Sequence, residues 1–351
     1  MKKTLLNAAA FLLILSALTG CRDTADNDSE TGGLYFSSFF GGFQEIAYFD
    51  IENPSSIYQI SNNLAAVPYI VNLADSYIMR GSSYLIYFVS GSQLNLFDFE
   101  SGFSYSVPGL NTIYSAKISP DQMKILCNNS GAYSVFDIIN STTDGIPTII
   151  PSTAMPEQNM ISWSNDSSRF AAVSEHSGFG DDIYIYNMND SSIFQLTNYA
   201  GAYSVRQPAW SPDGEWIAFT SNYFDLPASD VVMIRPDGSS LKRVTTSDSI
   251  YENTPVWSPD GKKVLYFIDN GVGVNALAVI SMDGTSQIQL TDHSGGSGVN
   301  SAGWSFYGTK IIFSADWSGF DEIYIIDPDG GSAEQLTFGG SNSSNPVWRR
   351  N

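Results

Sequence analysis

The chain has 351 residues, and its 36 acidic against 16 basic side chains give a formal net charge of −20. This charge repels nucleic acid and anionic lipid head groups, so neither is expected as a partner. Apolar and aromatic residues, 43% and 13% of the chain, favour a β-rich folded protein over a disordered one. Solubility outside the cytoplasm is the plain interpretation of the charge, and binding of a cation or a basic partner is the alternative.

The first twenty residues have the pattern of a bacterial lipoprotein signal. A basic start precedes an apolar run from Leu5 to Leu18, which is too short to span a bilayer comfortably. The small residues Thr19 and Gly20 then lead to Cys21. By resemblance to lipoproteins, we expect residues 1–20 to be a signal peptide and Cys21 to be the lipidation site. The alternative is an ordinary signal peptide followed by an incidental cysteine.

Residues 21–33 are predicted to be an acidic tether, because almost none of their side chains is apolar. Residues 34–351 are predicted to form a single domain. The other cysteine, Cys127, lies in an apolar run and is expected to be a small buried hydrophobic residue. Together these features predict a protein of the bacterial cell envelope, anchored by lipid at the periplasmic side of the outer membrane or at the cell surface.

A repeated motif organises the domain. Trp210-Ser211-Pro212-Asp213-Gly214 precedes an apolar run and returns as Trp257-Ser258-Pro259-Asp260-Gly261, 47 residues later. Each unit reads as an inner strand ending at Trp, a tight turn, a second strand, a loop, a third strand, a second turn and a fourth strand that ends in Leu-Thr. Four antiparallel strands in 40 to 47 residues predict one blade of a β-propeller.

The number of repeats predicts an all-β, seven-bladed propeller. The positions equivalent to the motif tryptophan are Ile78, Ile118, Trp163, Trp210, Trp257, Trp304 and Trp348. The domain begins on a second-strand pattern and stops after an inner strand, so the C-terminal strand is expected to pair with the N-terminal blade and close the ring. Six blades are the alternative, if residues 34–60 or 69–108 are irregular.

These repeats resemble the TolB-type propeller repeats of bacterial envelope proteins. Pro208 to Gly214, Pro255 to Gly261 and the Gln-Leu-Thr endings carry the resemblance, which is strong from about residue 160 to 348. The resemblance implies the fold. It leaves the function open, because related repeats serve in scaffolds, peptidases and polysaccharide lyases.

The motif residues themselves are interpreted as structural, because Pro, Asp and Gly are the residues that a turn requires. The irregular loops between second and third strands, and the crossovers between blades, should share the opposite face of the ring. Glycine-spaced aromatic residues on such loops suit recognition, and packing over the blade edges is an equally weighted alternative. The candidate binding residues are His176, Phe179, Tyr223, Phe224, Trp317 and Phe320.

A second group of candidates precedes the inner strands and should line the mouth of the central channel. These residues are Arg206, Glu252, Asn253, Asn300 and Asn345. Polar side chains there could bind a peptide or a glycan, and holding channel water is the favoured alternative.

The sequence lacks the spacing of known catalytic and metal sites. His176 and His293 do not have the spacing of zinc ligands, and no Gly-x-Ser-x-Gly elbow occurs. We therefore expect no cofactor, no metal and no catalytic residue. The leading hypothesis is a monomeric, non-catalytic, lipid-anchored propeller that binds an envelope protein or peptide. The alternative is a propeller that binds or cleaves glycans, suggested by the aromatic loops and by paired carboxylates such as Asp321 and Glu322.

Overall fold

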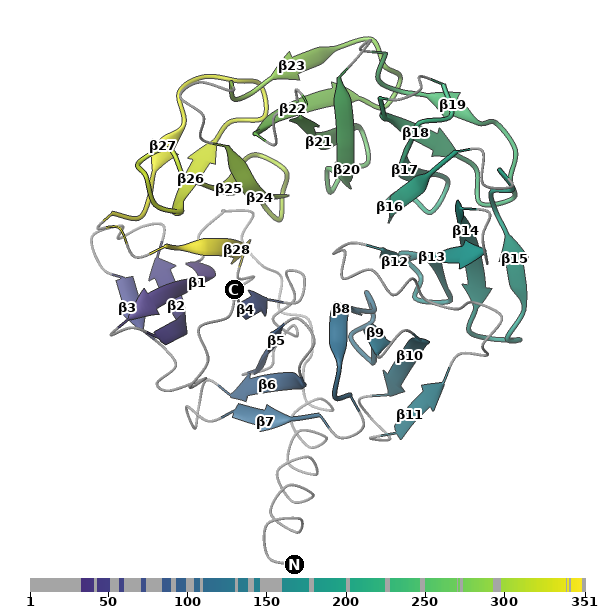
Figure 1. Cartoon of the computed structure of the whole chain (residues 1–351), viewed down its shortest axis with the longest axis horizontal. Coiled ribbons are helices and arrows are strands. Elements are labelled where there is room, and N and C mark those ends of the chain that lie inside the picture. The colour runs from purple at the N-terminus through teal and green to yellow at the C-terminus, as the bar shows by residue number, and fades with distance from the viewer. Residues whose placement is uncertain are drawn as a thin grey trace, which may run out of the picture.

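The computed structural model of the chain is a ring of β-sheets around a central axis (Figure 1). Residues 1–32, which include Cys21 and nearly all of the predicted tether, lie outside the described residues. The structure describes residues 33–40, 43–50, 57–59, 71–73, 84–89, 93–98, 104–107, 110–129, 132–137, 142–145, 160–176, 180–199, 203–224, 228–246, 250–269, 271, 274–292, 298–338, 340 and 342–348. No helix within these ranges has the length and apolar character needed to span a membrane.

The strands in these ranges form seven antiparallel sheets of four strands each, which are the blades of a propeller. Blade 1 contains β28 (Ser344–Trp348), β1 (Gly33–Phe40), β2 (Phe43–Asp50) and β3 (Ile57–Gln59). Blade 2 contains β4 (Val71–Leu73), β5 (Tyr84–Val89), β6 (Leu94–Asp98) and β7 (Ser104–Ser106). Blade 3 contains β8 (Ile113–Ile118), β9 (Lys124–Asn129), β10 (Ala132–Asp137) and β11 (Thr142–Gly145).

The other four blades come from the part of the chain in which the Trp-Ser-Pro-Asp-Gly motif is best preserved. Blade 4 contains β12 (Ile161–Trp163), β13 (Arg169–His176), β14 (Gly180–Asn187) and β15 (Ile193–Gln195). Blade 5 contains β16 (Val205–Trp210), β17 (Ile217–Ser221), β18 (Asp230–Ile234) and β19 (Lys242–Arg243). Blade 6 contains β20 (Tyr251–Trp257), β21 (Lys263–Asp269), β22 (Asn275–Ser281) and β23 (Gln287–Gln289). Blade 7 contains β24 (Val299–Trp304), β25 (Ile311–Ala315), β26 (Glu322–Ile326) and β27 (Glu334–Gln335).

The last strand of the chain lies beside the first. β28 pairs antiparallel with β1, with Trp348 opposite Leu34 and Val347 opposite Tyr35. Figure 1 shows the yellow β28 next to the purple β1. Blade 1 therefore combines the two ends of the domain in one sheet.

Two parts of the fold expectation need correction. Hydrogen-bonded ladders stay within single blades in the described residues, so hydrogen bonds do not close the ring as one continuous sheet. The pairing of β28 with β1 completes one blade, and side chains between blades hold the ring together, because stacked sheets meet through their side-chain surfaces. The six-bladed alternative is also wrong, since residues 34–60 and 69–108 each contain strands of a four-stranded sheet.

The inner strand of blade 2 also differs from expectation. It is β4, which ends at Leu73, whereas the sequence suggested a strand that ends near Ile78, a residue outside the described ranges. Blade 2 has no Trp-Ser-Pro-Asp-Gly motif to mark where its inner strand ends.

The core consists of apolar clusters between neighbouring blades. In β17, Ile217 and Phe219 pack in a cluster with blade 4, whereas Ala218 packs in a cluster with blade 6. Successive side chains of a strand point to opposite sides of its sheet, so the middle strands of a blade bury both faces. Cys127 is buried as expected, and burial raises the pKa of its thiol to about 12.

The motif tryptophans join adjacent inner strands. The indole N–H of Trp163 donates to the carbonyl oxygen of Lys117 at 3.1 Å, and that of Trp304 donates to Val256 at 3.0 Å. In each case the acceptor residue directly precedes the residue that is equivalent to the motif tryptophan in the previous blade. Trp210 differs, because its indole donates to Gly214 in its own turn. The repeated tryptophan thus supplies both apolar area and a hydrogen bond between blades.

Candidate binding face

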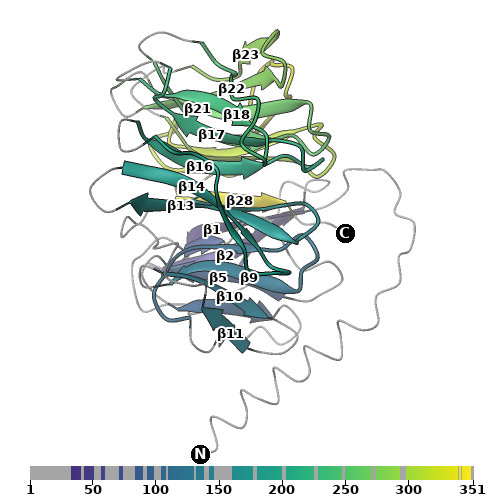
Figure 2. The same cartoon turned by 90° about the vertical axis from the view of Figure 1, so that its right-hand side faces the viewer.

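The two ends of the blades have different connections, which gives the ring two distinct faces. We call the side with the first-to-second and third-to-fourth strand turns the turn face, and the side with the second-to-third loops and the crossovers the loop face. Figure 2 shows the ring from its side, with the blades stacked around the axis. On the loop face, loops contact crossovers directly. The backbone N–H of Ser204 donates to the Asn222 side chain at 2.8 Å, and that of Gly298 donates to Asp316 at 2.7 Å.

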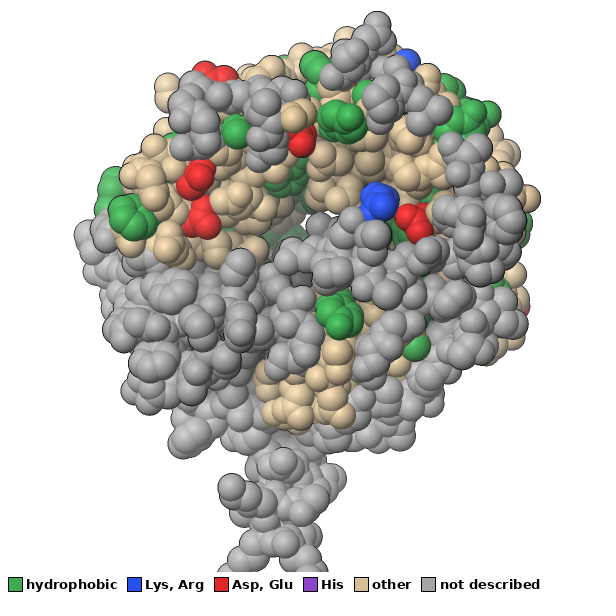
Figure 3. Space-filling model, viewed as in Figure 1, with side chains coloured by type: hydrophobic (Ala, Val, Ile, Leu, Met, Phe, Trp, Pro, Cys, Tyr) green, Lys and Arg blue, Asp and Glu red, His purple; other side chains and the backbone are tan. Residues whose placement is uncertain are grey.

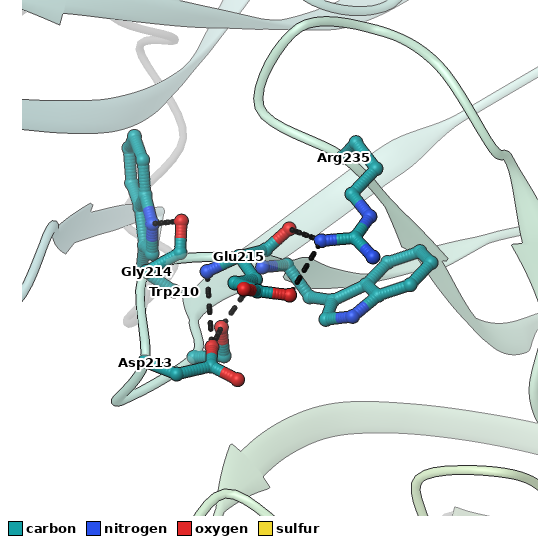
Figure 4. A network of polar contacts seen from close by, with 7 residues as sticks. Trp210, Asp213, Gly214, Glu215 and Arg235 are labelled. Atoms are coloured by element: carbon teal, nitrogen blue, oxygen red, sulfur yellow. Dashed lines mark hydrogen bonds and ion pairs between the residues drawn. The ribbon is translucent and has the colours of Figure 1, made fainter.

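The Trp-Ser-Pro-Asp-Gly turn belongs to the framework, as Figure 4 shows for blade 5. Ser211 donates its hydroxyl to Asp213, which also accepts the backbone N–H of Glu215 at 2.9 Å. Gly214 has a φ of +74°, a conformation that glycine adopts without strain. The guanidinium of Arg235 pairs with Glu215 at 2.7 Å and lies over the ring of Trp216. The Asp213 carboxylate is therefore occupied by its own turn.

A second repeated device lies at the loop-face ends of the third and fourth strands. The Thr197 hydroxyl accepts the backbone N–H of Ile183 at 2.9 Å and donates to the buried Asp182 carboxylate at 2.8 Å. In blade 7, Thr337 makes the same two contacts, with Ile323 and Glu322. We call this arrangement the acid–threonine clamp. From the sequence, the Leu-Thr ending was used only as a repeat mark, and Glu322 was interpreted as one of a pair of carboxylates suited to a glycan. The contact between acid and threonine was missed, although both residues recur at a fixed spacing.

Tyr223 and Phe224 lie in an aromatic cluster on the loop face. The Tyr223 ring stacks on Tyr199 with a centroid distance of 4.9 Å, and it meets Tyr203 and Phe224 edge to face, each at 4.9 Å. Tyr199 and Tyr203 come from the crossover between blades 4 and 5, and Tyr223 and Phe224 follow β17. We call these four residues the aromatic cluster.

The inner and outer parts of the aromatic cluster differ. Tyr199 packs partly buried against the core between blades 4 and 5, and burial raises its pKa to about 12. Tyr223 and Phe224 are 38% and 41% exposed. The cluster therefore has a fixed base and an accessible outer pair of rings.

The two candidates on blade 7 have different surroundings. Trp317 packs against the core between blades 6 and 7, with ring centroids 5.3 Å from Phe313 and 4.8 Å from Tyr324. Phe320 is 49% exposed and lies over Gly340, where an added Cβ would be 3.0 Å from the Phe320 ring. Trp317 therefore supports the blade, as the packing alternative expected, whereas Phe320 remains accessible.

Of the two remaining loop candidates, His176 and Phe179, the structure describes only the backbone of His176. His176 is the last residue of β13, where its backbone is opposite Gly180. Phe179 lies outside the described residues.

The channel-mouth candidates have several different environments. Arg206 lies 3.6 Å from Asp181 in an ion pair that joins blades 5 and 4. Asn253 accepts a hydrogen bond from the Thr254 hydroxyl at 3.0 Å. Glu252 does not face an open channel mouth, because it is fully buried. These placements pair Arg206 with blade 4 and separate Glu252 from solvent.

Asn300 and Asn345 lie near the junction of blades 7 and 1. The amide of Asn300 donates to Asp321, whose pKa is raised mainly by burial and further by the charges of Asp316 and Glu322. Asn345 has a φ of +52° in β28, at the position where Gln207 and Thr254 also have positive φ in their inner strands. The Gln207 side chain accepts the backbone N–H of Thr254 at 2.9 Å, so this bend links neighbouring blades.

The two faces differ in their number of basic residues. Most of the described basic side chains lie on the turn face, where Lys263 pairs with Asp329 and Lys310 with Asp327, each at 2.6 Å. The described loop-face segments hold two basic residues, Arg206 and Arg243, and both are paired with acids. Their acidic residues include Asp181, Asp182, Asp230, Glu252, Asp269, Asp292, Asp316, Asp321 and Glu322. Figure 3 shows one face of the ring, with acidic side chains at several places and few basic ones around the central opening.

Within the described ranges, no three His, Cys, Asp or Glu residues are grouped so that they could hold a metal ion. The described residues of the loop face offer exposed aromatic rings, amide groups and carboxylates to a ligand. These groups suit non-covalent recognition of a surface or a side chain.

Comparison with known proteins supports the resemblance found in the motif. Residues 150–294, which are less than half of the chain, match the TolB beta propeller domain. An uncharacterized protein of Agrobacterium fabrum is 28% identical over 212 residues, which are 54% of this chain and 70% of that relative.

Solved structures extend the likeness to the whole ring. TolB from Acinetobacter baumannii superposes with a TM-score of 0.53 and 16% identity, over 90% of this chain and 82% of that one. Oligogalacturonate lyase from Vibrio parahaemolyticus superposes with a TM-score of 0.59 and 11% identity, over 90% of each chain. Identities this low establish a shared fold only. The motif, the domain match and the fold together show that this chain resembles the TolB-type β-propeller repeat proteins.

Proposed function

We propose that this chain is a non-catalytic β-propeller that binds a protein or peptide partner in the bacterial cell envelope through its loop face. The observation that carries the proposal is the aromatic cluster, whose outer rings are exposed above a rigid base. Exposed aromatic residues on loops over a rigid scaffold are typical of recognition surfaces. The resemblance to TolB-type repeats supports a place in the envelope.

The anchor belongs to the same proposal. Signal cleavage before Cys21 and acylation of that residue would hold a monomeric ring at a membrane surface through lipid alone. Replacing Cys21 by Ser should move the mature protein from the membrane fraction to the soluble fraction and remove incorporation of labelled fatty acid. Retention of both properties would contradict the anchor, while leaving the binding face to be tested separately.

A pull-down from detergent-solubilised envelope tests the binding face. The wild-type ring should capture a partner that the Tyr223→Leu, Phe224→Leu double variant loses. Phe306 and Tyr307 supply a matched control on the turn face, because they are also in edge-to-face contact and are 41% and 39% exposed. The Phe306→Leu, Tyr307→Leu double variant should retain the partner. Loss of the partner in both double variants, or in neither, would contradict a site on the loop face.

An assay on polysaccharides separates this proposal from a glycan-cleaving function. The fold is shared with an oligogalacturonate lyase, so a panel that includes pectic substrates is the appropriate test. We expect no new unsaturated or reducing ends. Cleavage of any member of the panel would replace the non-catalytic proposal.

A further inference from the structure

The exposed rings of the aromatic cluster are suited to bind a cation. Aromatic ring faces carry negative partial charge, and a Lys or Arg side chain within about 6 Å of a ring centroid is attracted to it. Tyr223 and Phe224 meet edge to face, so they present ring surfaces in two directions. An apolar contact and a cation contact are thus available on neighbouring rings.

Charges around the cluster favour the same ligand. Tyr199 donates its backbone N–H to the Asp182 carboxylate at 3.2 Å, which places this carboxylate at the base of the cluster. Arg206, on the strand that follows Tyr203, is paired with Asp181. The other basic residue of the described loop-face segments, Arg243, is paired with the buried Asp230 at 2.9 Å. A cation that approaches this face therefore meets an excess of carboxylates.

The chain uses its own cation–π contacts elsewhere. Among the described residues, Arg169 lies 4.9 Å from the Trp210 ring centroid and Arg235 lies 4.2 Å from that of Trp216. Trp210 is the motif tryptophan of blade 5, and Trp216 lies just after that motif, so both contacts lie at the turn face. No basic residue of the described part of the chain makes such a contact with the aromatic cluster. The outer rings of the cluster, Tyr223 and Phe224, are accessible to a ligand.

We propose that the aromatic cluster binds an arginine or lysine side chain of a basic segment in the protein partner. This inference rests on the proposed function and specifies the chemistry of the partner. The rings provide the local contact, and the acidic loop face provides the longer-range attraction.

A labelled peptide provides a direct test. A short fluorescein-labelled peptide of Gly, Ser and Arg is titrated with the mature protein and followed by anisotropy. The Tyr223→Leu, Phe224→Leu double variant should weaken binding about fivefold to thirtyfold, the range expected for loss of a cation–π site. The Phe306→Leu, Tyr307→Leu double variant should change binding less than about twofold, because it removes equal aromatic area from the turn face.

Two further controls separate the ring contact from general attraction by the acidic protein. A peptide with citrulline in place of Arg keeps the side-chain shape without the charge and should bind at least about tenfold more weakly. Tyr223→Phe keeps the ring and should retain binding of the Arg peptide, and urea unfolding of the double variant should show the cooperative transition of a folded protein. Raising the salt concentration should weaken binding by all variants, because it screens the long-range part.

Equal binding by the two double variants, or equal binding of the citrulline peptide, would overturn the inference. Binding of a neutral oligosaccharide that depends on Tyr223 and Phe224, with no binding of the Arg peptide, would also overturn it in favour of a glycan. If the envelope pull-down depends on the loop face while the Arg peptide does not bind there, the proposed function stands. The proposal that the partner offers a basic segment is then wrong. If neither depends on the loop face, both proposals fail.

Discussion

The indole N–H of Trp257 donates a hydrogen bond of 2.9 Å to the carbonyl oxygen of Ala209, on the inner strand of the preceding blade. Trp257 is also buried in the cluster between blades 5 and 6. The same side chain thus contributes apolar contact and a polar link between the two blades. This relationship explains why tryptophan recurs at the end of the inner strand.

The first prediction concerns this link. Trp257→Phe should lower the free energy of unfolding by about 1–3 kcal/mol, because it removes buried area and leaves the Ala209 carbonyl without its indole donor. Trp210→Phe is the control, since its indole donates within its own turn. Urea unfolding of both variants should show the larger loss for Trp257→Phe. Equal losses would mean that the hydrogen bond between blades adds nothing to the apolar contact.

The second prediction concerns the acid–threonine clamp. Thr337→Val should destabilise the ring by about 2–4 kcal/mol, because it removes the partner of a buried carboxylate and of a backbone N–H. Thr291 is a matched control, since it accepts the N–H of Leu277 but its blade has Ala276 at the position of the acid. Thr291→Val should therefore cost less, about 1–2 kcal/mol. A similar loss in both variants, measured by urea unfolding, would show that the carboxylate contact is unimportant.

The third prediction concerns the strand that completes blade 1. Deleting residues 342–351 removes β28 and exposes Leu34, which packs in the cluster between blades 7 and 1. The truncated protein should melt at lower temperature and be less soluble, because the edge of β1 becomes free to pair with other chains. Val347→Asp should lower the melting temperature without shortening the chain, since Val347 is buried. A truncation that melts and dissolves like the mature protein would contradict the role of β28.

The fourth prediction concerns Asp321, whose pKa is raised by burial and by neighbouring carboxylates. A carboxyl with a raised pKa in the folded state adds stability below its unfolded pKa, and this contribution is lost as the pH rises through the folded pKa. Asp321→Asn should therefore raise the urea midpoint, relative to wild type, more at neutral pH than at about pH 4. A difference that does not change with pH would mean that the charge of Asp321 carries no penalty.

The fifth prediction concerns Asp283, whose contribution to stability should change with pH in the opposite direction. The hydrogen bond from Ser281, together with donors from Thr285, lowers the pKa of Asp283 to about 2. A lowered pKa contributes stability above the unfolded pKa, and this is lost as the pH falls through the folded pKa. Asp283→Asn should therefore be less stable than wild type at neutral pH and approach it between about pH 4 and pH 2. A deficit that persists at the lowest pH would instead indicate altered turn geometry.

The sequence predicted a structural feature correctly where the residues that form it are close together in the chain. The turn residues Ser211, Asp213 and Gly214 interact within a few positions of each other, so their structural role could be predicted from residue type. Strand patterns likewise predicted antiparallel units of four strands. In blade 2, where no motif marks the inner strand, the prediction placed that strand too late in the chain.

Contacts that depend on the register between strands could not be predicted from the sequence in the same way. Asp182 and Thr197 are 15 residues apart and meet only because β14 and the segment after β15 are aligned. The burial of Glu252 and the packing of Trp317 also depend on neighbouring strands. The exposed aromatic residues Tyr223 and Phe224 were found as candidates, but their contact with Tyr199 and Tyr203 required the crossover to be placed beside the loop.

The direction of β1 has a consequence for how the ring would be presented at a membrane. As the second strand of its blade, β1 begins at Gly33 on the turn face, opposite the last residues of β2. A lipid anchor at Cys21 would then be joined to the turn face by a short acidic segment with a mean reach of about 20 Å. The aromatic cluster would be directed away from the bilayer, toward partners that approach from the aqueous side rather than toward proteins embedded in the same leaflet.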